Sequence, residues 1–334
     1  MDCSGAANTL GRRKGSRRHS VVNRARVAIG PALSHTSWAW VGGDMVPHLV
    51  RHYHVEVFPH LGELPPCDVA VVVKNQALGP IVETLAGRTR IIYLPVDFYE
   101  TEEQLRADAS FLSACAAIVI HCDRLRPWME AYCANVWAID HYNKFGLDPP
   151  AGYRGDGFIL WVGQFRYSPY VLEWARTHPP PLPLVLLSNP QEADGLERAT
   201  ELAQSFGWRL DLSDGRLNGH RLLIWSPAEQ QRLMASAKAA IDIKGTDSFF
   251  QYTKPPTKAQ KFVMSGLPLA LNHASSPYEY LRNRSLQPAT PDDAERWFSE
   301  KYWRETSDLG RRLREELSLE AVAGRLRGYI DRLL

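Results

Sequence analysis

Lysines cluster in the stretch TKPPTKAQKFVMSGLPLALN, residues 253–272, directly ahead of an apolar segment. Lys254 and Lys258 flank the expected start of a helix that Gly266 ends, and Lys261 follows on the same face. Free N–H groups and the helix dipole attract anions at a helix start and disfavour cations there. The spacing therefore predicts a phosphate site, and a solvated basic surface is the alternative.

The segments around this helix offer further ligand contacts. Thr257 is expected to cap the helix, and Gln251 lies in the preceding loop, GTDSFFQYTK, within reach of sugar hydroxyls. Gly163 follows an expected strand and lets the backbone approach a ligand, although an ordinary turn explains it equally well. Arg166, three residues later, can bind a phosphate through two N–H groups.

Trp225 and Ser226 follow another expected strand of the second half. The Trp225 ring can stack on a nucleobase, and core packing is its alternative role. Ser226 stands directly before a proline, which is typical of a residue that caps a helix. We count both as ligand-binding candidates because ligands bind at the carboxyl ends of parallel strands.

The first half offers a glycine loop and a candidate base. Gly42, Gly43 and Asp44 follow the first expected strand without the full spacing of a dinucleotide fingerprint, so a flexible loop is the preferred interpretation. Asp97, in YLPVDFYE, comes directly after a strand and is the best candidate base of this half. A solvated loop carboxylate or a helix cap is the alternative for Asp97.

Short apolar runs alternate with amphipathic segments along the chain, and this alternation predicts parallel sheets with helical crossovers. The expected strands are 27–30, 54–58, 68–73, 90–95, 116–121, 136–140, 158–162, 184–187, 208–212, 222–225, 239–243 and 268–271. The expected helices are 44–52, 102–115, 123–133, 170–176, 192–206, 227–237 and 257–265, with an amphipathic helical tail from 291.

The alternation is interrupted by KFGLDPPAGYRGDG, residues 144–157, whose proline and glycine content is typical of an interdomain linker. We therefore predict two α/β domains facing a cleft. The predicted parts are a disordered basic tail at 1–26, a Rossmann-like domain at 27–145, a linker at 146–157, a second Rossmann-like domain at 158–290, and helices at 291–334 that return to the first domain.

Composition narrows the class of protein. The chain has 334 residues, a formal charge of +2 and five cysteines. The small net charge gives no reason to expect a nucleic acid as partner. Because the cysteines are odd in number and form no CxxC pair, we expect neither a disulfide framework nor a zinc site. Without a long apolar run or the apolar stretch of a secretory signal, we expect a cytoplasmic protein. The tail holds seven arginines and lysines between 12 and 26, which allows peripheral membrane contact or a solvated leader.

The order of these segments resembles GT-B-type glycosyltransferases, which have two Rossmann-like domains. Lys258 matches the lysine of their donor helix, followed by Ser-Gly-x-Pro and a strand. In many members of this family, a glutamate stands five residues before the glycine, and here Lys261 occupies that position. Thr253 occupies the position of a second acid. The other resembling segments are 37–58, 139–145, 159–175 and 221–243.

The resemblance implies a nucleotide-diphosphate sugar as donor, no other cofactor, and a glycan, lipid or small-molecule acceptor. It makes 27–145 the acceptor domain, with an acceptor-side loop at 42–44, and 158–290 the donor domain. The further donor-binding candidates are then Gly163, Trp225, Ser226, Gln251 and Thr257. Arg166, Lys254 and Lys258 would stabilise the leaving diphosphate, and Lys261 could add to them. No paired-carboxylate motif stands out, so no metal is expected. The missing acids keep a second hypothesis open, a GT-B-like protein that binds nucleotide or glycan without catalysis. A third hypothesis makes the basic tail the functional part, as a membrane-surface or nucleic-acid binder.

Overall fold

The computed structural model describes residues 24–33, 36–74, 89–190 and 196–334. Most of the predicted basic tail, residues 1–23, lies outside the described residues. Within the described part, no helix is both long and apolar enough to cross a membrane. The four described cysteines are free and buried.

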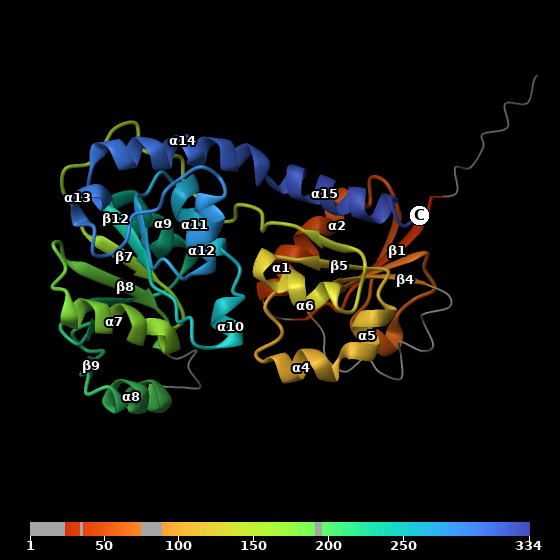
Figure 1. The fold of residues 1–334 in the computed structure, drawn as a ribbon, viewed down its shortest axis with the longest axis horizontal. Coiled ribbons are helices and arrows are strands. Elements are labelled where there is room, and N and C mark those ends of the chain that lie inside the picture. The colour runs from red at the N-terminus through yellow and green to blue at the C-terminus, as the bar shows by residue number, and fades with distance from the viewer. Residues whose placement is uncertain (1–23, 34–35, 75–88, 191–195) are drawn as a thin grey trace, which may run out of the picture.

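Two β-sheets, each built mainly of parallel strands, form the centres of the two halves of the molecule (Figure 1). The first sheet has the order β2-β1-β3-β4-β5-β6, with every neighbouring pair parallel. Its strands are β1 Arg26–Gly30, β2 His54–Val57, β3 Val69–Val73, β4 Arg90–Leu94, β5 Ala117–Ile120 and β6 Val136–Ala138. The central strand β3 is an unbroken buried run of valines and alanine, as expected when helices cover both faces of a sheet.

The second sheet has the order β13-β12-β7-β8-β11-β10-β9. Its first five strands in this order pair in parallel, and β9 and β10 add an antiparallel edge. The strands are β7 Ile159–Val162, β8 Leu184–Ser188, β9 Leu210–Asp211, β10 Arg216–Leu217, β11 His220–Ile224, β12 Ala239–Asp242 and β13 Leu269–Leu271. The predicted α/β class with two Rossmann-like halves is confirmed.

The helices of the first half are shorter than predicted. They are α1 Thr36–Val41, η1 Gly43–Met45, α2 Val46–Leu49, η2 Leu61–Glu63, α4 Glu102–Ala107, α5 Ala109–Ala114, η3 Asp123–Leu125 and α6 Arg126–Glu130. The predicted helix 102–115 divides at Asp108, where the backbone leaves helical geometry and the carboxylate accepts a hydrogen bond from the Tyr99 hydroxyl at 3.1 Å. The helix α1 was not predicted.

The helices of the second half match the predicted amphipathic segments more closely. They are η4 Phe165–Tyr167, α7 Ser168–Thr177, α8 Leu196–Ser205, α9 Pro227–Ser236, α10 Phe249–Tyr252, α11 Thr257–Met264, α12 Ser276–Arg282, α13 Ala294–Trp297, α14 Glu300–Glu316 and α15 Leu319–Asp331. The short helix α10 lies in the segment predicted as a loop. The Ser248 hydroxyl caps it by accepting from the Gln251 N–H at 3.3 Å.

The two C-terminal helices bridge the halves of the molecule (Figure 1). Helix α14 lies against α11, where a Cβ on Gly310 would sit 2.2 Å from the Val263 carbonyl oxygen, so only glycine allows this approach. Helix α15 then crosses to the first sheet and buries Val322, Leu326 and Ile330 in its core. The chain therefore passes between the halves twice.

The two passages lie side by side. The N–H of Asn143, at the end of the first half, donates to the carbonyl of Leu317, between α14 and α15, at 2.8 Å. Slightly further along, the N–H of Leu147 donates to the Ser265 hydroxyl at 3.0 Å. The linker is thereby attached to both α11 and the C-terminal helices.

Candidate functional site in the cleft

Helix α11 begins and ends as its sequence dictates. Gly266 ends it with φ +65°, and the N–H groups of Gly266 and Leu267 donate to the carbonyls of Val263 and Phe262 at 2.9 and 3.0 Å. Pro256 occupies the cap position and Thr257 is the first helical residue, so the prediction that Thr257 caps the helix is wrong. The apolar face is buried, which leaves the lysines to the other face.

A cavity of about 330 Å³ lies between the two halves, and we call it the cleft cavity. It collects residues that follow β4, β6, β7 and β12, together with residues of α1, α10 and α11. Its lining comprises Ser37, Trp40, Val96, Asp97, His141, Trp161, Gly163, Gln164, Tyr167, Tyr170, Asp242, Ile243, Lys244, Gln251, Lys254, Pro255, Thr257, Lys258 and Lys261. The carboxyl ends of both sheets thus meet where open α/β sheets bind their ligands.

Lys258 is held by a buried carboxylate. Its Nζ lies 2.7 Å from one oxygen of Asp242 and donates to the Val162 carbonyl at 3.0 Å. Lys244 holds the other oxygen of Asp242 at 2.9 Å. Burial opposes ionisation of Asp242, but the two lysines outweigh it and keep the pKa of this carboxyl below its usual value. Burial also lowers the pKa of Lys244 to about 8.

Asp97 is shared by lysines from both halves of the molecule. Its oxygens lie 2.6 Å from Nζ of Lys74 and 3.3 Å from Nζ of Lys254. Burial raises the pKa of Asp97, but the two ammonium groups outweigh this effect and lower it to about 2. A carboxylate with so low a pKa is a weak proton acceptor at neutral pH. The structure therefore favours a charge-positioning role for Asp97 over the predicted role of base.

Lys261 differs from its neighbours because it has no carboxylate partner within ion-pair distance in the described part of the chain. Its Nζ lies 5.5 Å from the centre of the Trp40 ring and 5.6 Å from that of Phe145. Burial, with a smaller effect from Lys258, lowers the pKa of Lys261 to about 8. It is thus an uncompensated cation between two aromatic rings.

The remaining donor-binding candidates divide between the cavity and its rim. Gln251 lines the cavity and is buried. Gly163 also lines it, and a Cβ there would sit 2.6 Å from the Trp161 ring, so packing alone accounts for this glycine. Arg166 is exposed at the rim, where its Nε donates to the Gln164 side chain at 3.1 Å and its guanidinium lies 5.0 Å from the Tyr167 ring centre.

The structure does not bring Trp225 and Ser226 to the cleft cavity. They follow β11, which β8 separates from β7 in the sheet order. The Trp225 indole donates to the Gln230 side chain at 2.9 Å. The Ser226 hydroxyl caps α9 by accepting from the Glu229 N–H at 3.1 Å.

The predicted acceptor-side loop also lies away from the cleft-cavity lining. Gly42 packs against the Trp38 ring, with a hypothetical Cβ only 2.4 Å from it, and Gly43 begins η1. Asp44 accepts from the Tyr142 hydroxyl at 2.5 Å and pairs with Lys144 at 2.7 Å. This carboxylate attaches the loop to the end of the first half.

Sequence reasoning missed several residues of the cavity. His141 follows β6, and its Nδ1 lies 3.1 Å from the Thr257 hydroxyl, while burial lowers its pKa to about 4. The pair of Asp242 and Lys244 was also missed. A signal for that pair existed, because an aspartate inside the apolar strand of AIDIK has to find a cation when it is buried.

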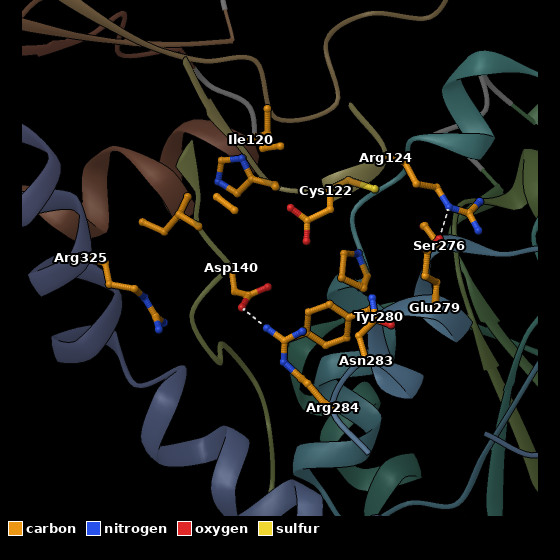
Figure 2. Close-up of a pocket in the computed structure, with 15 residues that line it drawn as sticks. Ile120, Cys122, Arg124, Asp140, Ser276, Glu279, Tyr280, Asn283, Arg284 and Arg325 are labelled. Carbon is orange, nitrogen blue, oxygen red and sulfur yellow. Dashed lines mark hydrogen bonds and ion pairs between the residues drawn. The ribbon is translucent and has the colours of Figure 1, made fainter. Parts of the chain in front are cut away.

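A second cavity, of about 280 Å³, lies between the halves and is lined by residues of β5, β6, α12 and α15 (Figure 2). In Figure 2, Arg284 reaches Asp140, and the two side chains pair at 3.0 Å. Arg124 pairs with Glu279 at 2.8 Å across the interface. Two arginines of the second cavity therefore pair with carboxylates, and the three arginines of its lining are matched in number by Asp123, Asp140 and Glu279.

Two facing parallel α/β sheets, with C-terminal helices that return to the first, define the GT-B fold of glycosyltransferases. The solved structure of HepE from Anabaena, in complex with UDP and glucose, matches with a TM-score of 0.56 and 12% identity over 92% of this chain and 100% of that chain. AviGT4, a glycosyltransferase involved in avilamycin A biosynthesis, matches with a TM-score of 0.54 and 14% identity over 92% and 98%. No family model and no curated protein matches the sequence.

Proposed function

We propose that the protein transfers a sugar from a nucleotide-diphosphate donor to an acceptor, and that the donor binds in the cleft cavity. The observation that carries this proposal is the position of Lys254 and Lys258, which flank the start of α11 and line the cavity between the sheets. Free N–H groups at a helix start and lysine side chains are a common combination at phosphate sites. HepE, which shares the fold, has UDP and glucose in its structure.

The lysines would act on the leaving group. Negative charge grows on the diphosphate as its bond to the sugar breaks, and cations already fixed in place stabilise that charge without rearrangement. Asp242 fixes Lys258 at 2.7 Å, and Asp97 fixes Lys254 at 3.3 Å. Arg166, at the rim, would add a contact to the outer phosphate.

A second candidate function is binding of nucleotide or glycan without transfer. The carboxylates that line the described part of the cavity, Asp97 and Asp242, are both held by lysines. Neither is free to take a proton from an acceptor hydroxyl. His141 is neutral at pH 7 and lines the cavity, so it is the remaining candidate to receive that proton.

The test is calorimetric titration of wild type and Lys258→Gln with UDP, GDP and dTDP. A charge-assisted contact contributes roughly 1.5–3 kcal/mol, so the variant should bind the preferred nucleotide about tenfold more weakly or worse. Lys301→Gln is the matched control, because Lys301 is exposed on α14. Near-UV circular dichroism verifies folding, since Lys258 also pairs with buried Asp242.

Equal affinities of wild type and Lys258→Gln would contradict the proposed donor site. Saturable nucleotide binding by wild type, with no sugar released from the corresponding nucleotide sugars and no transfer to any acceptor, would favour the second candidate function. Transfer that is lost in His141→Gln while nucleotide affinity is kept would identify His141 as the proton acceptor.

A further inference from the structure

Lys261 lies where a donor helix would meet its ligand, yet it differs from the other cavity lysines. Lys244, Lys254 and Lys258 each have a carboxylate oxygen within 3.3 Å. Lys261 has no such partner in the described ranges of the chain, and Lys258 is the charged group that acts on its pKa. An ammonium group without a counterion in a partly dry cavity costs free energy, so its presence calls for an anion.

The charges of the cavity can be matched group by group. The negative charge of Asp97 neutralises one of the two lysines that it contacts. In the same way, the negative charge of Asp242 neutralises one of its two lysine partners. Each phosphate of a sugar-linked diphosphate carries one negative charge. The two phosphates of the proposed donor would therefore neutralise the second lysine beside Asp97 and the second lysine beside Asp242. Lys261 then still has no counterion when the diphosphate is bound.

The aromatic neighbours of Lys261 show that it lies on a different side of the cleft cavity from Lys254 and Lys258. Lys254 lies 3.8 Å from the centre of the Phe250 ring, and Lys258 lies 5.6 Å from that of Trp161, both in the second half of the chain. Lys261 instead faces Trp40 of α1 and Phe145 at the end of the first half. A group bound there contacts both halves of the molecule.

We propose that Lys261, between Trp40 and Phe145, forms a second anion subsite for an acidic group that the substrates carry in addition to the diphosphate. The inference rests on the proposed function, because it places this subsite beside the diphosphate site. The shared chemistry is a carboxylate or phosphate on a sugar. Either a donor with an acidic sugar or an acidic acceptor can supply it.

The first arm of the test concerns the donor. Calorimetry compares the glucose and glucuronate forms of the nucleotide that binds best among UDP, GDP and dTDP. If the donor supplies the acid, wild type should prefer the glucuronate form about tenfold or more. Lys261→Gln should lose this preference, and Lys261→Arg should keep it because the charge remains.

The second arm concerns the acceptor. Glucuronate and glucose 6-phosphate are titrated into wild type and Lys261→Gln, both saturated with the same nucleotide. Binding to wild type that Lys261→Gln loses would assign the acid to the acceptor. If the nucleotide binds but neither arm shows an affinity gain that depends on Lys261, the proposed subsite is wrong and the proposed function is unaffected. Failure of every nucleotide to bind wild type would instead contradict the proposed function.

A control separates ligand binding from a structural role of Lys261. Removal of an unpaired, partly buried charge should leave the melting temperature of ligand-free Lys261→Gln equal to that of wild type or higher. A decrease of several degrees would show that the ammonium group supports the fold and would count against the subsite.

Discussion

The two cavities between the halves of the molecule have similar volumes, about 330 and 280 Å³, but opposite charge arrangements. In the second cavity, the guanidinium groups of Arg284 and Arg124 meet Asp140 and Glu279 across the interface (Figure 2). In the cleft cavity, lysines outnumber aspartates. Paired charges complete an interface, whereas a surplus of one sign calls for a ligand of the other sign. The comparison therefore supports the cleft cavity as the proposed ligand site.

The largest expected effect compares one aspartate from each cavity. Asp242→Asn leaves Lys244 and Lys258 without their common counterion, and it should lower the free energy of unfolding by about 3–5 kcal/mol. Asp140→Asn keeps an acceptor for Gln260, which donates to Asp140 at 2.8 Å, and should cost about 1–2 kcal/mol. Urea unfolding measures both values.

Exposed Asp247→Asn is the control for this pair of variants, and its effect should stay within about 0.5 kcal/mol. Equal losses for Asp242→Asn and Asp140→Asn would contradict the charge difference between the two cavities.

The pH dependence of nucleotide affinity should sharpen the comparison. Burial lowers the pKa of Lys254, at the proposed diphosphate site, to about 8, so Lys254 loses its proton between pH 7 and 9. Protonated lysine binds the anion, and the affinity should therefore fall as pH rises, by about tenfold over this interval. Calorimetry at pH 7, 8 and 9 measures it.

The carboxylates and histidines at the cleft cavity and behind it do not change charge in this pH range. Asp97, with a pKa of about 2, stays ionised, and so does Asp242, whose pKa is also lowered. His141, with a pKa of about 4, stays neutral, and buried His121 behind it has its pKa lowered well below the usual value. Burial lowers the pKa of Lys244 to about 8, so Lys244 also loses its charge as pH rises, and this loss also weakens the binding of an anion. An affinity that is constant from pH 7 to 9 would show that these lysines do not contact the ligand.

The smallest expected effect concerns Asp97. Asp97→Asn removes the carboxylate that competes with a ligand for Lys254, so nucleotide affinity should rise by a few-fold, about 0.5–1 kcal/mol. Transfer should persist if the residue only positions charge. Loss of transfer with unchanged affinity would restore the role of base that the sequence suggested, and Asp308→Asn, exposed on α14, is the matched control away from the cavity.

The sequence predicted the position of Lys254 and Lys258 at the start of α11 because the closing glycine and the apolar spacing are local signals. It failed for Trp225, since the strand end it occupies is visible in the sequence but the strand order is not. Which strand ends become neighbours depends on the sheet, and β8 separates β11 from β7.

Long-range ion pairs were equally invisible in the sequence. Lys74 and Lys254 stand on opposite sides of Asp97 in the chain and meet at its carboxylate only in the folded molecule. Asp44 was expected in a flexible loop because no local pattern announces its partners Tyr142 and Lys144. Such residues acquire their roles from tertiary packing.

The adjacent passages of the chain at Asn143 and Leu317, joined by a hydrogen bond of 2.8 Å, have a mechanical consequence. Two adjacent chain connections between the domains form a hinge. Such a hinge permits rotation of one domain about a single axis and resists sliding or twisting. Opening the cleft would then separate Asp97 from Lys254 and Arg124 from Glu279 in one movement. Entry of a ligand and release of these cross-domain ion pairs would be the same mechanical event.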